Sequence, residues 1–172
     1  MEERYPIGKF EKPVIITDAL VTEWIQNMAA YPSKLSKIVE ALTEEDQQLT
    51  YREGAWTIKQ LVHHIADAQV NVYTRIKLAL TEEKPSIKPF EENGWANLVD
   101  SQLPIQSSLY IIEGIHARLA YLIEQQTFEE LERSFKHPDT GLQTVLSTLA
   151  FSVWHVNHHL AHIQNALATR TA

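Results

Sequence analysis

The chain has 172 residues, no cysteine and a formal net charge of -7. Its length predicts a single domain, residues 1–172, that can bury a core without disulfides. The lack of cysteine excludes a disulfide framework, thiolate metal ligands and a nucleophilic cysteine. It is also consistent with a reducing compartment such as the cytoplasm.

Charge and hydropathy exclude two classes of partner. Asp and Glu outnumber Lys and Arg by 22 to 15, and no basic run is present to displace the counterions of a nucleic acid. No apolar run approaches the roughly 20 residues that span a bilayer, and the start Met1-Glu2-Glu3-Arg4 lacks the apolar segment of a signal peptide. The sequence therefore predicts a cytoplasmic protein with neither nucleic acid nor membrane as partner.

Two amphipathic helices are predicted in the first half of the chain. The first runs from about Leu20 to Leu42 and contains Pro32, which should kink or split it. The second begins at Thr57, where Gln60 three residues later completes a capping-box pattern, and continues to about Leu80.

A long crossing loop is predicted between the second and third helices. Residues 81–104 contain three prolines and a glycine, which are Pro85, Pro89, Gly94 and Pro104. Loops of this length in compact domains are often functional. We expect its aromatic residues, Phe90 and Trp95, to pack over the helices.

Two more helices complete the predicted fold. The third runs from about Ile105 to Glu124 and the fourth from about Thr144 to Thr169, with a possible β-hairpin at Ser134 to Gln143 between them. Four amphipathic helices pack as a bundle, so the predicted fold class is an all-α four-helix bundle.

Six of the eight histidines fall in two of these helices. The second helix carries His63-His64, and the fourth carries His155, His158, His159 and His162. Imidazole is the commonest metal ligand, and residues four apart share one face of a helix. The fourth helix therefore offers two candidate ligand pairs, His155/His159 and His158/His162.

Helical geometry favours one of these pairs. At about 100° per residue, His155/His159 lie about 100° from the centre of the apolar stripe, at its edge, whereas His158/His162 lie about 160° away, on the opposite face. In the second helix, His64 lies about 90° from the centre of the apolar stripe and His63 lies about 170° from it. Ligands must point into the bundle or its mouth, so the predicted set is His64, His155 and His159.

A polar strip accompanies His64 along the second helix. Asn71 and Arg75 share its edge, and Asp67 lies further round. In one interpretation these three residues are catalytic, with Asp67 accepting the N–H of a ligand imidazole. In the other, Asp67 is a solvated surface acid.

His116 has two interpretations as well. It lies in the middle of the apolar stripe of the third helix, which favours a hydrogen-bonded core histidine over a pocket residue that faces the ion. Phe151 and Trp154 are expected to be packing residues. The sequence has no H-E-x-x-H, Walker, G-x-S-x-G or G-x-G-x-x-G motif, so nucleotide and serine-nucleophile chemistry have no support.

Several sequence blocks together form a recognisable pattern. They are Tyr5-Pro6-Ile7-Gly8, Tyr51 through Thr57, His63 through Asp67, Asn71, Arg75, Lys77 through Glu82, Pro89-Phe90, Trp95, Phe135 through Asp139, and Trp154-His155 through His162-Ile163. With these blocks the chain resembles the YfiT branch of the DinB-like superfamily. The resemblance covers nearly the whole chain, and the blocks of the second and fourth helices are the strongest.

The resemblance implies a DinB-like four-helix bundle, a homodimer, and a zinc or nickel ion held by His64, His155 and His159. Members of this branch are described as metal-dependent hydrolases, and relatives in bacilli act as bacillithiol S-transferases. All three ligand positions follow the pattern of the family.

Three hypotheses for function follow, because three protein ligands leave positions of the ion open, as in catalytic sites. The first is transfer of a low-molecular-weight thiol to an electrophile, with Arg75 or Arg52 binding a carboxylate of that thiol. The second is hydrolysis of a substrate by metal-activated water, with Asp67 as general base. The third is a non-catalytic metal-binding stress protein.

Overall fold

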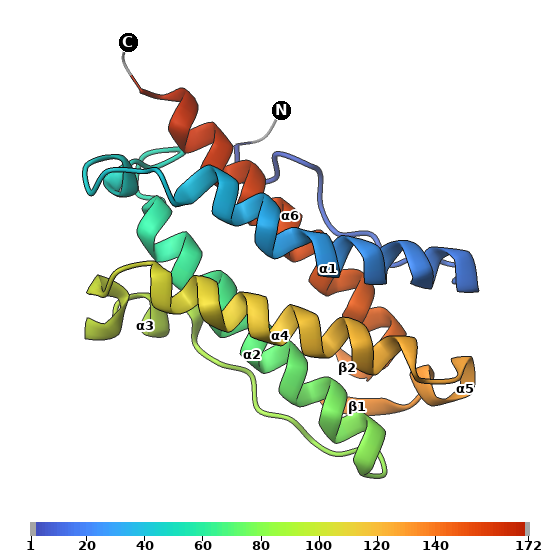
Figure 1. Cartoon of the computed structure of the whole chain (residues 1–172). Coiled ribbons are helices and arrows are strands. Elements are labelled where there is room, and N and C mark those ends of the chain that lie inside the picture. Colours follow the sequence, from blue (N-terminus) through green and yellow to red (C-terminus); the bar gives the residue numbers. More distant parts are fainter. Residues whose placement is uncertain (1–2, 171–172) are drawn as a thin grey trace.

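The computed structural model describes residues 3–170 and consists mainly of four long helices (Figure 1). These are α1 (Asp18–Val39), α2 (Ile58–Thr81), α4 (Gln106–Glu124) and α6 (Val145–Ala168). The predicted all-α four-helix bundle is therefore confirmed. No helix among the described residues is long and apolar enough to cross a membrane.

Short elements fill the connections between the long helices. They are the 3-10 turns η1 (Asp46–Gln48) and η2 (Val99–Gln102), the helices α3 (Glu92–Ala96) and α5 (Phe128–Leu131), and the strands β1 (Ser134–His137) and β2 (Gly141–Thr144). The two strands pair in an antiparallel hairpin, as the sequence predicted. Gly141 begins β2 with a φ of +73°, which a glycine adopts without strain.

The direction of the helices explains the long crossing loop. In Figure 1, α1 and α6 run one way and α2 and α4 the other, and both α1 and α2 pack against α4 and α6. Because α2 and α4 are parallel neighbours, the chain must return along the bundle between them. The 24 residues of α2 span about 36 Å, which roughly 11 extended residues can cover.

The returning segment also pairs with the hairpin. The Lys136 amide donates to the Pro85 carbonyl over 2.8 Å, and the Ile87 amide donates to the Lys136 carbonyl over 3.0 Å. These bonds cover the outer edge of β1, which would otherwise expose unpaired backbone groups.

Capping residues fix where the two histidine-bearing helices begin. The side chain of Thr57 accepts from the amide of Gln60, and that of Thr144 accepts from the amide of Ser147, each within a reciprocal capping box. A cap of this kind stabilises a helix by about 1 kcal/mol. The predicted starts of both helices agree with the structure.

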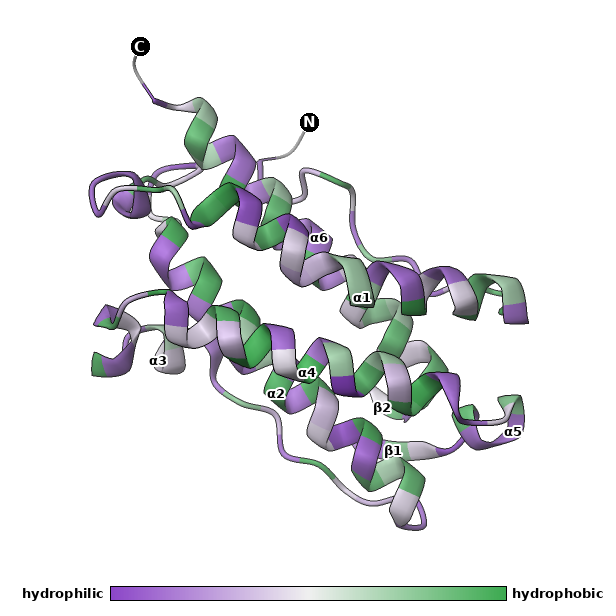
Figure 2. Cartoon of the chain, in the orientation of Figure 1, coloured by the Kyte–Doolittle hydropathy of each residue, from purple (hydrophilic) through white to green (hydrophobic). Residues whose placement is uncertain are grey.

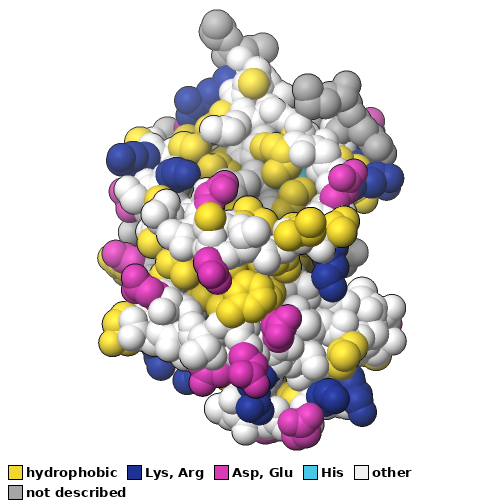
Figure 3. Space-filling model, turned by 90° about the vertical axis from the view of Figure 1, so that its right-hand side faces the viewer, with side chains coloured by type: hydrophobic (Ala, Val, Ile, Leu, Met, Phe, Trp, Pro, Cys, Tyr) yellow, Lys and Arg dark blue, Asp and Glu magenta, His cyan; other side chains and the backbone are white. Residues whose placement is uncertain are grey.

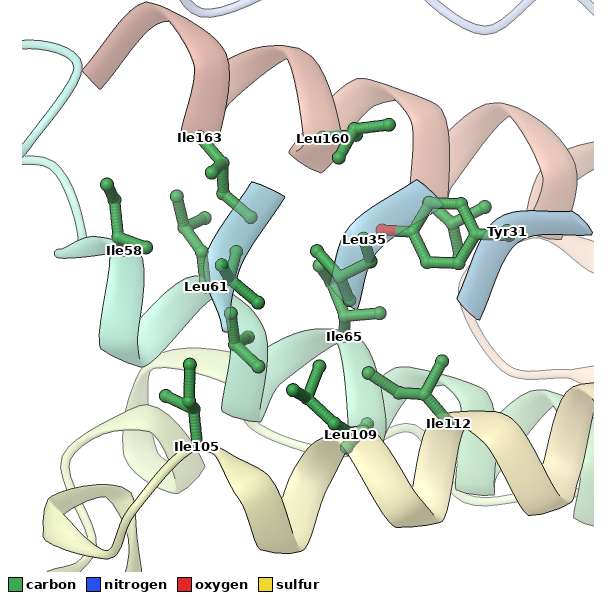
Figure 4. Close-up of a cluster of buried hydrophobic side chains, with 14 of the residues drawn as sticks. Tyr31, Leu35, Ile58, Leu61, Ile65, Ile105, Leu109, Ile112, Leu160 and Ile163 are labelled. Atoms are coloured by element: carbon green, nitrogen blue, oxygen red, sulfur yellow. The ribbon is translucent and has the colours of Figure 1, made fainter. Parts of the chain in front are cut away.

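The core lies between the four helices, where their apolar stripes meet (Figure 2). Figure 4 shows side chains of all four pointing toward one another, among them Leu35 of α1, Ile65 of α2, Ile112 of α4 and Ile163 of α6. All four are fully buried, and each contributes about 1.5–3 kcal/mol by leaving water. On the face of the molecule that Figure 3 shows, acidic and basic side chains are interspersed.

The predicted split of the first helix at Pro32 is wrong, because α1 continues through it. Pro32 has no N–H for the carbonyl of Met28, four residues earlier, and this lost bond is one reason why proline disrupts helices. Here Nδ1 of His116 in α4 donates to the Met28 carbonyl over 2.8 Å. His116 is fully buried, and burial lowers its pKa to about 4, so the ring stays neutral near pH 7. It is the hydrogen-bonded core histidine that the sequence favoured.

We expect the contribution of His116 to depend on Pro32. In the natural chain His116→Leu should cost about 1–3 kcal/mol, since the buried Met28 carbonyl loses its partner. In a Pro32→Ala background the backbone amide gained by the substitution can bond to that carbonyl, so the same change should cost clearly less. Urea unfolding of the four proteins at pH 7.5 measures the coupling. An equal cost in both backgrounds would show that the bond is unrelated to Pro32.

Candidate metal centre

Three imidazoles converge between α2 and α6. His64 comes from α2, and His155 and His159 stand one turn apart on α6, with only 2 %, 8 % and 8 % of their surfaces exposed. Nε2 of His155 lies 3.3 Å from Nε2 of His64 and 3.1 Å from Nε2 of His159. The structure thus brings together the three residues that helical angles had selected.

The spacing of these nitrogens suits a small divalent ion. Zinc–nitrogen bonds of 2.0–2.1 Å in a tetrahedral arrangement separate two ligand nitrogens by about 3.3 Å. Burial lowers the pKa of His64 to about 4. Burial, reinforced by the neighbouring imidazoles, holds the pKa values of His155 and His159 well below the ordinary value. All three rings are therefore neutral near pH 7 and have a lone pair to offer.

Aromatic rings surround this triad. The Trp56 ring, just before the cap of α2, lies 4.6 Å from the His64 ring, and Phe151 lies 5.5 Å from His155. Phe90 of the crossing loop lies 6.3 Å from His64 and 4.9 Å from Trp95, so this loop packs over the site as predicted. These rings exclude water from most of the triad and lower the local dielectric constant.

The placement of His158 and His162 differs from the sequence analysis. Both were assigned to the face opposite the apolar stripe, yet they are only 7 % and 2 % exposed. The N-terminal segment, residues 3–10, and the loop before α2 cover that side of α6. His158 stacks on Trp154 with ring centroids 4.6 Å apart, and His162 stacks on Tyr51 at 3.8 Å.

This burial creates a second group of potential ligands, His158, His159 and His162. Hydrogen bonds distinguish it from the first. Nε2 of His162 lies 3.3 Å from the carbonyl of Arg4, which can only accept, so this nitrogen carries the proton. Nδ1 of His162 then accepts from Nδ1 of His159 over 3.3 Å. That tautomer leaves Nε2 of His159 unprotonated and directed at the first triad, which therefore is the better metal site.

His63 was placed about 170° from the apolar stripe of α2, yet it too is buried. Its Nε2 donates to the Leu103 carbonyl over 3.1 Å, and the Ser108 hydroxyl lies 2.7 Å from its Nδ1. The end of the crossing loop covers this side of α2. His63 thus attaches that loop to the bundle and does not join the triad.

Within residues 3–170, the carboxylate of Asp67 makes no hydrogen bond to an imidazole of the triad. For His159, it is His162 that accepts a ring N–H. Asp67 is half-buried, and burial together with the nearby Asp100 raises its pKa to about 6.

Asn71 and Arg75 continue along the same side of α2. The Asn71 amide donates to the Asp67 backbone carbonyl over 2.9 Å. Burial lowers the pKa of Arg75, while the nearby Glu92 acts in the opposite direction. Neither residue lines the pocket that reaches the triad.

A pocket of about 370 Å³ opens beside His159. Its lining consists of Arg4, Tyr5, Tyr51, Arg52, Gly54, Ala55, Trp56, Asn93, His158, His159 and His162. Several of these residues, among them Arg4, Tyr5 and Trp56, lie in irregular segments without periodicity, so sequence reasoning had not placed them at the site. A second hollow, of about 250 Å³, lies between Ala79 and Arg133 and has no histidine in its lining.

Known proteins match this chain in sequence over nearly their whole length. A protein of Halalkalibacterium halodurans named "Putative metal-dependent hydrolase" is 42 % identical over 167 residues, which are 97 % of this chain and 98 % of the relative. One of the same description from Oceanobacillus iheyensis is 43 % identical over 171 residues, 99 % of both chains.

Solved structures agree with the fold. YfiT from Bacillus subtilis, described as "a probable metal-dependent hydrolase with an unusual four-helix bundle topology", is 38 % identical, covers 95 % of both chains and has a TM-score of 0.91. A mycothiol-dependent maleylpyruvate isomerase matches in fold alone, with a TM-score of 0.64 and 19 % identity over 81 % of this chain and 59 % of that one.

The model of the DinB superfamily matches residues 29–163, which include all three triad histidines. Together with the relatives above 40 % identity, this match defines the family. The chain belongs to the DinB superfamily.

Proposed function

We propose that this protein is a metal-dependent S-transferase, which joins a low-molecular-weight thiol to an electrophile at an ion held by His64, His155 and His159. The names of its relatives support a metal-dependent enzyme. The observation that carries the choice of reaction is the pocket beside His159, whose lining within residues 3–170 has two arginines and no carboxylate. A nucleophile made there must be formed without a general base from the pocket wall.

A divalent ion, when bound, supplies a Lewis acid that lowers the pKa of a thiol or water molecule. The chain itself has no cysteine, so the sulfur must come from a cosubstrate. His159 is held in one tautomer by His162, and Trp56 and Phe151 shield the triad from water. The open pocket admits the cosubstrate next to His159.

Hydrolysis by a metal-activated water is the second candidate. It is favoured by Asp67, whose pKa of about 6 suits a general base near neutral pH. Asp67 is absent from the lining of the pocket, however, and hydrolysis therefore ranks below the thiol reaction. A non-catalytic metal-binding protein is the third candidate.

Zinc is the ion that we propose, with nickel second. Three imidazoles with open positions are typical of catalytic zinc, and imidazole also suits nickel. We further propose a homodimer, on the family resemblance alone.

The first prediction from this proposed function concerns metal content. Purified, metal-replete protein should contain about one ion per chain by elemental mass spectrometry, and His64→Ala and His155→Ala should lose it, since each removes one of three ligands. His158→Ala is the matched control, because it disrupts only the second group of histidines. If metal is lost in His158→Ala but kept in His64→Ala, the ion is bound by the second group of histidines and not by the triad.

The second prediction concerns His162. Its removal should free His159 to adopt the wrong tautomer, and loss of such an outer partner weakens metal affinity about 10–100-fold. Competition with a chromogenic chelator measures the affinity, and cobalt absorption spectra report the ligand geometry. His162→Gln should restore part of the affinity, because an amide oxygen can accept from His159. Equal affinity in His162→Ala and the natural protein contradicts the proposed bond.

The third prediction separates the reactions. Zinc-loaded protein should accelerate conjugation of monochlorobimane with a small thiol such as mercaptosuccinate, and the acceleration should vanish in His64→Ala. Without thiol, it should not hydrolyse p-nitrophenyl acetate faster than His64→Ala does. Ester hydrolysis that needs His64 but no thiol would favour the second candidate. Bound metal with no turnover in either assay would favour the third candidate, a non-catalytic metal-binding protein.

A further inference from the structure

Two arginines in the pocket beside His159 have no obvious structural task. We propose that Arg52, assisted by Arg4, forms a carboxylate-binding subsite, so that the molecule bound next to the triad is a small organic anion with one or more carboxylates. The inference deepens the proposed function by naming the chemistry of its substrate. The inference rests on the proposed function only for the group of that molecule that reacts at the triad.

The hydrogen bonding of Arg52 leaves most of its donors unused. One Nη donates to the Glu53 carbonyl over 3.1 Å, and the guanidinium lies 5.4 Å from the centre of the Tyr51 ring. Its Nε is buried and has no partner among residues 3–170. A buried donor without a partner costs about 1–3 kcal/mol, which a ligand oxygen would recover.

Two other arginines, Arg133 and Arg170, are committed to the fold. Arg133 donates to the carbonyls of Ala79 and Glu82 over 2.8 Å and 3.0 Å, and Arg170 forms an ion pair with Asp46. Within the described part of the chain, neither Arg52 nor Arg4 is in an ion pair. These two are the guanidinium groups that line the pocket.

The charge of the pocket is opposite to that of the whole molecule. The chain has a net charge of -7, yet the pocket combines two guanidiniums with imidazoles, and its described lining contains neither Asp nor Glu. A positive cleft in an acidic protein concentrates small anions. Guanidinium presents two parallel N–H groups that match a carboxylate, and a volume of about 370 Å³ suits a small molecule.

The loop of Arg52 is also connected to the triad. Its neighbour Tyr51 stacks on His162 at 3.8 Å with nearly parallel rings, and His162 hydrogen-bonds to His159. The carboxylate and the reacting group of one small molecule can therefore occupy the two ends of a single pocket. Arg75, the other arginine that the sequence offered, lies near Glu92 and outside this pocket.

Calorimetric titration with succinate tests the subsite. Succinate should bind to both zinc-loaded protein and metal-free His64→Ala, because its main contact is Arg52 and not the ion. Arg52→Gln should weaken binding at least tenfold in each form, and Arg52→Lys should weaken it less. Arg118→Gln removes the same charge from an exposed position on α4 and should leave binding unchanged. Circular dichroism checks that each variant is folded.

Four results would overturn the subsite. Three of them are unchanged affinity in Arg52→Gln, equal binding of the neutral diamide succinamide, and tighter binding of inorganic phosphate than of succinate. The fourth is succinate binding that disappears in His64→Ala while Arg52 is intact, since the carboxylate would then be a metal ligand. Metal content, measured separately, reports on the proposed function. If the natural protein binds no metal but binds succinate through Arg52, the subsite is retained and the metal-dependent S-transferase is rejected.

Discussion

The packing of α2 against α6 is the contact on which the site depends. It brings His64 within 3.3 Å of His155, although the two are far apart in sequence. Capping boxes at Thr57 and Thr144 fix where each helix begins, and apolar side chains between the helices fix their rotation. Three neutral imidazoles can be held together, away from water, because the hydrophobic core supplies the free energy that their burial costs.

The parallel arrangement of α2 and α4 has consequences beyond the length of the loop. The returning chain covers faces of α2 that a bundle with short turns would expose. It buries His63 under Leu103, beside Ser108 of α4, and it places Phe90 over His64. The N-terminal segment, residues 3–10, likewise covers the side of α6 that carries His158 and His162. Irregular segments thus form the second layer around the histidines and the walls of the pocket.

Periodicity and caps were sufficient to predict the four helices, the hairpin and the three converging histidines, because each of these follows from local spacing. Angles about a helix axis ranked His155/His159 above His158/His162, but they could not show that His162 is buried, since the chain that covers it begins about 150 residues earlier. The continuity of α1 through Pro32 likewise needed a partner from α4. Arg52 was suggested by charge alone, and only the pocket distinguishes it from Arg75.

The bond between His162 and the carbonyl of Arg4 couples the start of the chain to the centre of the bundle. If an ion binds at the triad as we propose, linkage makes this coupling reciprocal: docking of residues 3–10 against α6 and binding of the ion by His159 strengthen each other by the same factor. Arg4 also lines the pocket, so a bound anion would add to the same equilibrium. The N-terminal segment would then act as a binding partner of the site that belongs to the same chain, and its docking would report on whether the site is filled.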